Sequence, residues 1–156
     1  MISIIAAIGL NNEIGLNNKL LWHIKEDLQN FKKLTMNKYI VMGANTYYSL
    51  PKKLAGRKYI VLSSKIKNID NGLVFNDFDN CLDFVKKQEE EVMIIGGASI
   101  YKQFIPYADK IYLTEIMDTK EADAFFPEFS KEKYKKIIVK EETKEDLKYN
   151  FVIYER

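Results

Sequence analysis

The feature that most constrains the fold of this chain is a series of short apolar runs that do not alternate with polar residues. Strands buried on both faces of a largely parallel sheet have this pattern, whereas strands with one wet face alternate. The runs are Ile2–Ile8, Tyr39–Met42, Tyr59–Leu62, Leu73–Phe75, Val92–Ile95 and Ile111–Leu113. Helical patterns fall between several of them, over Lys25–Leu34, Asn45–Leu50, Phe78–Gln88 and Ala98–Phe104. Strand and helix in alternation predict an α/β domain.

The C-terminal part of the chain has a different pattern. Tyr134–Glu142 and Tyr149–Tyr154 are strand-like and are joined by the polar stretch Thr143–Lys148, which predicts an antiparallel hairpin at one edge of the sheet. Its lysines and glutamates alternate in sign. Charges of this kind protect a solvated sheet edge from pairing with other chains, and we interpret them in that way rather than as a binding surface.

Two polar connections are long for a small domain. Gly9–His23 is rich in asparagine and contains Leu20-Leu21-Trp22 near its end, and Met117–Pro127 ends in Phe125-Phe126-Pro127. Long connections in small domains are usually either functional lids or disordered segments. Because apolar residues stand at their ends, we expect both to fold down onto the domain.

Composition excludes several classes of protein. The chain has 156 residues, of which 47% are hydrophobic and 29% charged, and it fits a single domain over residues 1–156 with an apolar core. Lys and Arg number 24 against 22 for Asp and Glu, so the net charge of +2 argues against nucleic-acid binding. One cysteine (Cys81) and one histidine (His23) exclude a disulfide framework and a His-rich metal site. We expect Cys81 to pack in the core and His23 to be structural or exposed.

Targeting and membrane signals are not found in the sequence. No apolar run approaches the roughly 20 residues of a membrane-spanning helix. The start, Met1–Ile8, lacks the basic region of a signal peptide and has the pattern of a buried strand. We therefore expect no membrane association and, by default, a location in the cytoplasm.

The carboxylate of Asp27 is the most informative polar group. An apolar stripe at helical spacing runs along this segment and consists of Ile24, Leu28, Phe31, Leu34 and Thr35. Asp27 falls between Phe31 and Leu34, inside the stripe. Two interpretations are open. The side chain either caps the first turn of the helix, where acidic residues are favoured, or lies in a buried pocket with a raised pKa and pairs with donors of a ligand.

Three strand ends carry residues suited to a phosphate-bearing ligand. A buried strand runs into Gly96-Gly97 and then a helix, whose first N–H groups are free to meet an anion. Met42–Thr46 and Leu62–Lys65 leave two other strands with glycine, serine, threonine or lysine. Ligands collect at the carboxyl ends of parallel strands, so the three together favour a nucleotide site, although no GxGxxG or Walker motif is present.

Taken in order, these residues resemble the bacterial chromosomal type of the dihydrofolate reductase family over essentially the whole chain. The resemblance rests on the order and spacing of Met1–Ala7, Ile14-Gly15, Trp22, Asp27, Phe31, Thr35, Met42-Gly43, Thr46, Leu54–Arg57, Leu62–Ser64, Ile95–Tyr101, Tyr112–Thr114, Ala122-Asp123 and Phe126-Pro127. It implies a single α/β domain with a mostly parallel eight-stranded sheet, four flanking helices and an antiparallel C-terminal strand.

The reaction that the resemblance implies is reduction of 7,8-dihydrofolate to tetrahydrofolate for one-carbon metabolism. A hydride passes from NADPH to C6 and a proton is delivered to N5. The chain would thus be an NADPH-dependent oxidoreductase and an antifolate target, acting as a monomer on a small molecule, without a metal or a covalent intermediate. The cofactor supplies the hydride chemistry, whereas the protein supplies orientation and excludes water.

The resemblance implies catalytic roles for the residues of this chain that match the motifs of the family. Asp27 would be the carboxylate of the pterin site, accepting hydrogen bonds from the 2-amino group and N3 and favouring protonation of N5 through a water. Thr114 would support Asp27 from behind. Trp22 and Leu20 would belong to a mobile lid formed by residues 9–23.

The resemblance also implies two sets of binding residues. Arg57, which by spacing alone reads as part of a solvated basic loop, would hold the glutamate α-carboxylate with its planar fork. The implied substrate-binding residues are Ile5, Ala7, Asp27, Leu28, Phe31, Leu50, Leu54, Arg57, Ile95, Tyr101 and Thr114. The implied cofactor-binding residues are Ala7, Ile14, Gly15, Leu20, Gly43, Ala44, Asn45, Thr46, Leu62, Ser63, Ser64, Lys65, Ile95, Gly96, Gly97, Ala98, Ser99, Ile100, Tyr101 and Asp123.

The chain departs from the family pattern at four positions. Leu21 stands where proline usually precedes the tryptophan, which predicts a looser lid, and Ala122 stands where glycine is common in the second long loop. Ala44 and Ser99 stand where basic residues usually help to bind the phosphates of NADPH. We therefore predict weaker cofactor binding than in relatives that carry those basic groups. Lys65 would substitute in part, and NADPH would stay preferred over NADH.

Two other functions remain as alternatives. An NADPH-dependent reductase of the riboflavin-pathway type shares the fold, and a non-catalytic nucleotide-binding module would keep the glycines at the strand ends. The spacing of Trp22, Asp27 and Phe31, together with Arg57, favours a folate, because this combination serves a pterin with a glutamate tail. A nucleotide-binding module has no need for Asp27 on an apolar face.

Overall fold

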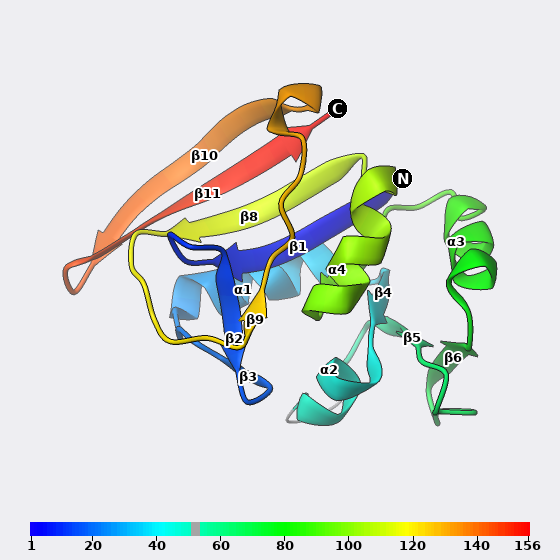
Figure 1. The fold of residues 1–156 in the computed structure, drawn as a ribbon. Coiled ribbons are helices and arrows are strands. Elements are labelled where there is room, and N and C mark those ends of the chain that lie inside the picture. Colours follow the sequence, from blue (N-terminus) through cyan, green and yellow to red (C-terminus); the bar gives the residue numbers. More distant parts are fainter. Residues whose placement is uncertain (51–53) are drawn as a thin grey trace.

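An eight-stranded sheet organises the structure. In the computed structural model, which describes residues 1–50 and 54–156, its strands run in the order β10-β11-β8-β1-β7-β4-β5-β6 (Figure 1). They are β1 (Ile2–Ile8), β4 (Tyr39–Met42), β5 (Lys58–Leu62), β6 (Gly72–Phe75), β7 (Val92–Gly96), β8 (Lys110–Ile116), β10 (Lys135–Lys144) and β11 (Leu147–Glu155). All neighbours from β8 to β6 are parallel, whereas β11 runs antiparallel to both β8 and β10.

Helices cover both faces of this sheet. They are α1 (Lys25–Thr35), α2 (Ala44–Ser49), α3 (Phe78–Lys86) and α4 (Ala98–Phe104). Side chains alternate along β1, so that Ile4 packs with α3 and α4 on one face and Ile5 packs with α1 on the other. Figure 1 shows α4 in front of the sheet and α1 behind it. The predicted fold class is confirmed: a mostly parallel eight-stranded sheet, four α-helices in the described residues, and an antiparallel C-terminal strand.

Most element boundaries lie within two residues of the predicted ones. The predicted strand at Ile111–Leu113 is longer at its end, because β8 stays paired with β11 as far as Ile116. α2 begins one residue earlier than predicted and ends at Ser49, because Leu50 precedes a proline in the sequence and has an extended ψ of 123°. α3 ends at Lys86 rather than Gln88, where its last turn tightens.

A small second sheet was not predicted. β2 (Glu13–Leu16) lies between β3 (Lys19–Leu20) and β9 (Ala124–Phe125), and so joins the two long connections. Asn17 and Asn18 form the turn between β2 and β3 with positive φ angles of 52° and 63°. Strands of two to four residues are too short to give a recognisable alternation, and the sequence therefore predicted loops here.

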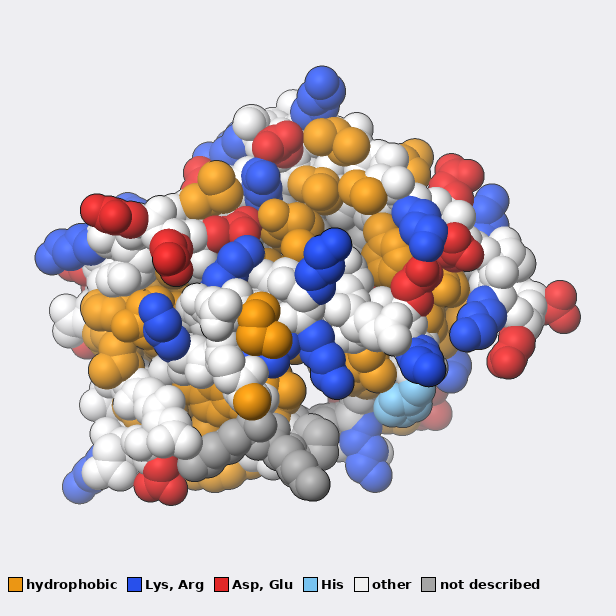
Figure 2. Space-filling model, turned by 180° about the vertical axis from the view of Figure 1, so that it is seen from behind, with side chains coloured by type: hydrophobic (Ala, Val, Ile, Leu, Met, Phe, Trp, Pro, Cys, Tyr) orange, Lys and Arg blue, Asp and Glu red, His pale blue; other side chains and the backbone are white. Residues whose placement is uncertain are grey.

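The C-terminal hairpin has the predicted antiparallel form with a tighter turn. Glu145 and Asp146 alone separate β10 from β11, with positive φ angles of 52° and 65°. β10 is an edge strand, and Ile138 and Val139 are 51% and 58% exposed where its register with β11 shifts. On the face of the molecule that Figure 2 shows, basic and acidic side chains are interspersed, with hydrophobic surface between them.

A partly buried polar cluster lies near the amino-terminal ends of the central strands β1, β4, β7 and β8. The Glu91 carboxylate accepts hydrogen bonds from Ser3 Oγ (2.5 Å), Lys38 Nζ (2.7 Å) and Tyr112 OH (3.0 Å). Burial by itself raises the pKa of Glu91, but these hydrogen bonds and the charge of Lys38 outweigh burial and leave the pKa lowered. The cluster therefore stabilises the folded state most when Glu91 is ionised.

We expect Glu91→Gln to lower the free energy of unfolding by about 1–2 kcal/mol at neutral pH, because three donors lose a charged acceptor. A carboxyl group whose pKa falls on folding contributes stability above its unfolded-state pKa and loses it as the pH falls through its folded-state pKa. The difference between the wild type and the variant should therefore shrink in acid. Urea unfolding of both proteins at neutral pH and at about pH 3 measures this. A difference that does not change with pH would contradict it.

Candidate active site

Helix α1 carries Asp27 in its first turn but does not use it as a cap. The helix begins after Ile24, and no side chain of the described residues caps it there. Asp27 Oδ1 instead accepts a hydrogen bond of 2.5 Å from the hydroxyl of Thr114 on β8. Of the two interpretations that the sequence left open, the structure does not form the helix cap. It places Asp27 partly buried against β8, and a pocket that binds a ligand there stays a prediction.

The surroundings of Asp27 disfavour its charge. Burial raises the pKa of Asp27, and the hydrogen bond from Thr114 opposes this rise only in part. Burial, and to a smaller extent the charge of Asp27, also raises the pKa of Tyr101. The Tyr101 hydroxyl lies 2.8 Å from the carbonyl oxygens of Ile5 and Ile95, and so ties β1 to β7. A carboxylate in such a place favours ligands that offer hydrogen-bond donors.

The apolar residues implied for the substrate are incompletely buried. Partly exposed side chains that pack against the core beneath α1 are Phe31, Leu50, Leu54 and Ile95. Leu28 is 42% exposed, whereas Ile5 is buried and Ala7 packs in a smaller cluster with Trp22. Apolar surface of this kind beside a single carboxylate suits a flat heteroaromatic ligand with donor groups at one edge.

Arg57 is fixed to the carboxyl-terminal end of α1. Its guanidinium donates to the carbonyl oxygen of Lys32 (2.7 Å), the hydroxyl of Thr35 (3.1 Å) and the carbonyl oxygen of Ala55 (2.6 Å). Spacing alone predicted a solvated basic loop. The side chain is indeed partly exposed, but these three hydrogen bonds hold it in place. A guanidinium has five N–H donors and three are used, so two remain for a ligand. Planar carboxylates match the geometry of this fork.

The two glycine junctions meet at the carboxyl edge of the sheet. The N–H of Gly43 donates to the carbonyl oxygen of Gly96 (2.9 Å), which brings the ends of β4 and β7 together. A Cβ on Gly97 would lie 3.7 Å from Thr46 Oγ1, and one on Gly43 would lie 3.2 Å from the Ile100 side chain. Because glycine leaves this space open, a ligand can approach the backbone of both junctions closely.

The third strand end, Ser63–Lys65 after β5, lies one strand further along the same edge. Ser63 Oγ accepts a hydrogen bond from the N–H of Lys65 (3.2 Å). Asn76 donates to the carbonyl oxygens of Ser63 (2.7 Å) and Ile66 (3.0 Å). Ser64 and Lys65 are exposed. Asn76 therefore holds a short loop whose polar side chains remain available to a ligand.

The other residues implied for the cofactor divide between the strand ends and the small sheet. Those beside the junctions are Leu62 at the end of β5, Ala44 and Asn45 in α2, and Ala98, Ser99 and Ile100 in α4. Those on β2 and β3 are Ile14, Gly15 and Leu20. Asp123 donates its N–H to the Gly15 carbonyl oxygen (3.0 Å), and its carboxylate accepts from the N–H of Asn17 (3.1 Å). Asp123 therefore lies in the contact between the two long loops.

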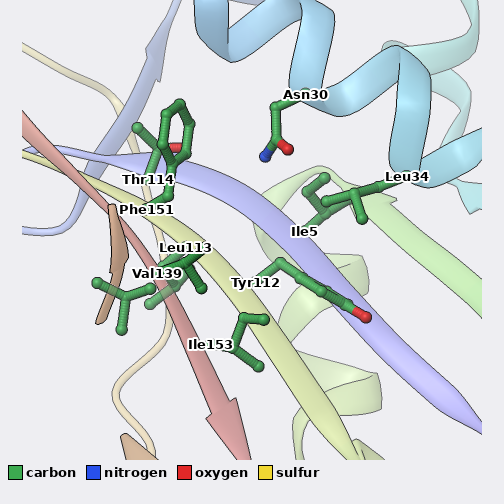
Figure 3. Close-up of a pocket in the computed structure, with 10 residues that line it drawn as sticks. Ile5, Asn30, Leu34, Tyr112, Leu113, Thr114, Val139, Phe151 and Ile153 are labelled. Carbon is green, nitrogen blue, oxygen red and sulfur yellow. The ribbon is translucent and has the colours of Figure 1, made fainter. Parts of the chain in front are cut away.

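A small cavity of about 130 Å³ lies between α1 and strands β8, β10 and β11 (Figure 3). Figure 3 shows Asn30 reaching from α1 into this cavity, with Thr114 and Phe151 at one end and Ile5 and Leu34 at the other. Thr114 is thus shared between the cavity and the hydrogen bond to Asp27.

Some residues beside the site were not singled out from the sequence. They are Glu13, Asn76, Asp118 and Lys120, and each makes a hydrogen bond that fixes a loop. Each stands alone in a polar stretch, so no spacing distinguishes it from a solvated residue. Trp22 and Asp118, Glu13 and Lys120, and Lys120 and Leu21 lie far apart in the sequence, and only the folded chain brings these pairs together.

The described residues contain neither a metal-ligand cluster nor a helix that could span a membrane. Within residues 1–50 and 54–156, no three His, Cys, Asp or Glu side chains are grouped so that they could hold a metal ion. Among the helices of the same residues, none has the length and apolar character needed to cross a membrane. His23 is exposed, and Cys81 is buried in α3, where burial raises its pKa to about 12.

The structure is an α/β fold in which Asp27 and the glycine junctions are candidates for a two-part ligand site at the carboxyl edge of the sheet. The family model for dihydrofolate reductase matches residues 1–156, and the chain belongs to this family. The resemblance seen in the sequence motifs is therefore confirmed.

Several dihydrofolate reductases are similar to this chain over most of their own length. A dihydrofolate reductase of Buchnera aphidicola subsp. Acyrthosiphon pisum is 43% identical over 161 aligned positions, which cover 99% of each chain. One of Bacillus subtilis is 38% identical over 160 positions, covering 100% of this chain and 95% of its own. The type 3 dihydrofolate reductase of Salmonella typhimurium is 38% identical over 130 positions, covering 83% of this chain and 80% of its own.

We expect Thr114→Val to raise the pKa of Asp27 further, because valine keeps the shape of the side chain but removes the hydrogen bond that opposes the effect of burial. Thr114→Ser keeps the hydroxyl and is the matched control, in which the pKa should stay close to that of the wild type. Titration of the Asp27 carboxyl carbon by carbon-13 NMR measures all three values. A valine variant that titrates like the wild type would show that this hydrogen bond does not set the pKa.

Proposed function

We propose that the protein reduces 7,8-dihydrofolate to 5,6,7,8-tetrahydrofolate, with NADPH as the source of the hydride. The observation that carries this proposal is Asp27, a carboxylate of raised pKa held by Thr114 on the apolar side of α1. A pterin ring offers its 2-amino group and N3–H to one carboxylate. Membership of the dihydrofolate reductase family supports the same substrate. We extend the proposal to the setting that the sequence predicts, a monomer in the cytoplasm.

Asp27 would both bind the pterin and help to protonate it. Its carboxylate accepts hydrogen bonds from the 2-amino group and N3–H of the ring. Its negative charge stabilises positive charge on the ring and so raises the basicity of N5, which takes its proton from a water rather than from Asp27 directly. Thr114 keeps the carboxylate oriented, because it engages one of the two oxygens and leaves the other to the ligand.

Arg57 and the apolar side chains would hold the rest of the substrate. The two N–H groups of Arg57 that are left over would bind the α-carboxylate of the glutamate tail. Tyr101 would shape the floor of the site, because it fixes the backbone of β1 against that of β7. Side chains that would enclose the pterin and aminobenzoyl rings are Ile5, Ala7, Leu28, Phe31, Leu50, Leu54 and Ile95.

The glycine junctions fit a dinucleotide. A side chain at Gly43 would crowd Ile100, and one at Gly97 would contact Thr46. Their absence would let phosphates approach the backbone. The hydroxyls of Thr46 and Ser63 and the ammonium of Lys65 would add hydrogen bonds and positive charge along the same edge. When bound, NADPH supplies the hydride that C6 of dihydrofolate receives.

The lid formed by residues 9–23 would cover the nicotinamide end of the site. Ile14 and Gly15 lie on β2, and Leu20 on β3 is 57% exposed. An exposed leucine at this position gains burial when a ring lies beneath it. Closure over the ligands would exclude water from the reacting atoms and hold them in line.

We expect Asp27→Asn to lower the turnover rate at neutral pH by about 100-fold or more, because an amide lacks the charge that favours protonation of N5. The matched control is Glu26→Gln, which makes the same change one residue away on a carboxylate paired with Lys140 (2.7 Å) outside the site. Oxidation of NADPH by dihydrofolate, followed across pH, measures both variants. Unchanged activity of Asp27→Asn would contradict the mechanism.

We also expect a lower Michaelis constant for NADPH than for NADH, with a difference smaller than in relatives that carry basic residues at the positions of Ala44 and Ser99. Lys65→Ala should reduce the difference further, because it removes a positive charge from the β5 end. Lys67→Ala, two residues along the same exposed segment, is the control. Equal constants for the two cofactors in the wild type would refute the preference.

A further inference from the structure

Glu13 is a buried carboxylate at the contact between the two long loops, outside the substrate site described above. It lies on β2 and is 2% exposed. One carboxylate oxygen accepts a hydrogen bond from the N–H of Asn11 (2.7 Å), and the other accepts from the N–H of Lys120 (3.0 Å). Burial of a charge is costly unless its hydrogen bonds are made, so these two bonds fix the backbone of the second loop against the base of the lid.

The side chain of Lys120 reaches the other arm of the lid. Its ammonium donates to the carbonyl oxygen of Leu21 (2.8 Å) and lies 5.6 Å from the centroid of the Trp22 ring. Trp22 Nε1 in turn donates to the Asp118 carboxylate (3.0 Å) on the second loop. We name the group Glu13, Lys120, Leu21, Trp22 and Asp118 the lid clamp. Its hydrogen bonds join the second loop to the lid at two places, Glu13 and the Leu21–Trp22 segment.

The packing inside the lid clamp is tight. A Cβ built on Gly9 would overlap both the Glu13 carboxylate and the Trp22 ring, so that these two side chains enclose Gly9 without spare space. The position of the indole is therefore coupled to the carboxylate and, through it, to the backbone of Lys120.

The hydrogen bond from Lys120 to Leu21 restrains a segment of the lid that has no regular secondary structure. Residues 21–23 belong to no helix or strand. A leucine at position 21, unlike a proline, leaves the backbone free to rotate about φ. The Lys120 ammonium holds the carbonyl of this residue and so limits that freedom from outside the segment.

We propose that Lys120 is a positioning residue that holds the Leu21–Trp22 arm of the lid in place and thereby sets how firmly the lid stays over the cofactor end of the site. Glu13 orients Lys120 through its backbone N–H. This inference rests on the proposed function for its kinetic consequence, but not for its structural one. The looser lid expected from Leu21 is thus restrained by a lysine that approaches from the second loop.

The test uses the one tryptophan of the chain, because Trp22 fluorescence reports directly on this arm. Lys120→Met keeps most of the apolar stem over the ring and removes the ammonium. Lys133→Met makes the same change on η2 (Lys131–Lys133), where the lysine is exposed and away from both loops, and is the matched control. Glu13→Gln is a second variant. The glutamine amide has only one acceptor oxygen, so its NH₂ group would face the N–H of either Asn11 or Lys120 and one of the two hydrogen bonds would be lost.

We expect acrylamide quenching of Trp22 to rise by about twofold in Lys120→Met and in Glu13→Gln and to stay at the wild-type value in Lys133→Met. The single-turnover rate with NADPH and dihydrofolate should fall about three- to tenfold in Lys120→Met, as for the loss of one partly exposed charge-assisted hydrogen bond. The Michaelis constant for dihydrofolate should be unchanged, because Lys120 does not touch that part of the site.

Wild-type quenching in Lys120→Met would overturn the proposal. Absence of turnover in the wild type would count against the proposed function instead. In that case the quenching comparison still decides whether the lid clamp holds Trp22, because it needs no substrate.

Discussion

The hydrogen bond from Thr114 to Asp27 joins helix α1 to strand β8, and the position of the proposed pterin site depends on it. Phe31 and Leu34 bring the same face of α1 onto the sheet by apolar contact, which fixes its distance but tolerates sliding along the strands. The hydrogen bond selects one register. Asp27 is partly buried there, so leaving its carboxylate unpaired is costly. A ligand with donor groups would pair the carboxylate oxygen that Thr114 does not engage.

The proposed cofactor side of the site depends on a second set of contacts. Tyr101 ties the carbonyls of Ile5 and Ile95 together, and the bond from Gly43 to Gly96 joins the ends of β4 and β7. At this carboxyl edge of the sheet, Gly43 and Gly97 have no side chain where a phosphate would approach. Arg57 is held separately, at the carboxyl-terminal end of α1. One rigid sheet thus sets the spacing between the two parts of the site, and the lid clamp sets the covering loop.

The sequence predicts the parts of this structure that follow from local pattern. Burial on both faces makes parallel strands apolar throughout, so their runs were recognisable, and the place of Asp27 in an apolar stripe marked the site. The strands β2, β3 and β9 are too short for such a pattern. Arg57 and Glu13 were not understood from spacing, because their partners, the end of α1 and the second loop, are brought close only by folding. The residue roles came from the family resemblance, since no pattern distinguishes a pterin wall from an ordinary core.

The most direct test of the central claim is the loss of nicotinamide absorbance when the purified protein is mixed with NADPH and 7,8-dihydrofolate, repeated with a 2,4-diaminopyrimidine antifolate. The account predicts steady turnover that the antifolate abolishes, because a protonated diaminopyrimidine offers Asp27 the same donors as the pterin. A protein that binds NADPH but leaves dihydrofolate unreduced would contradict the account and direct attention to other reducible heterocycles.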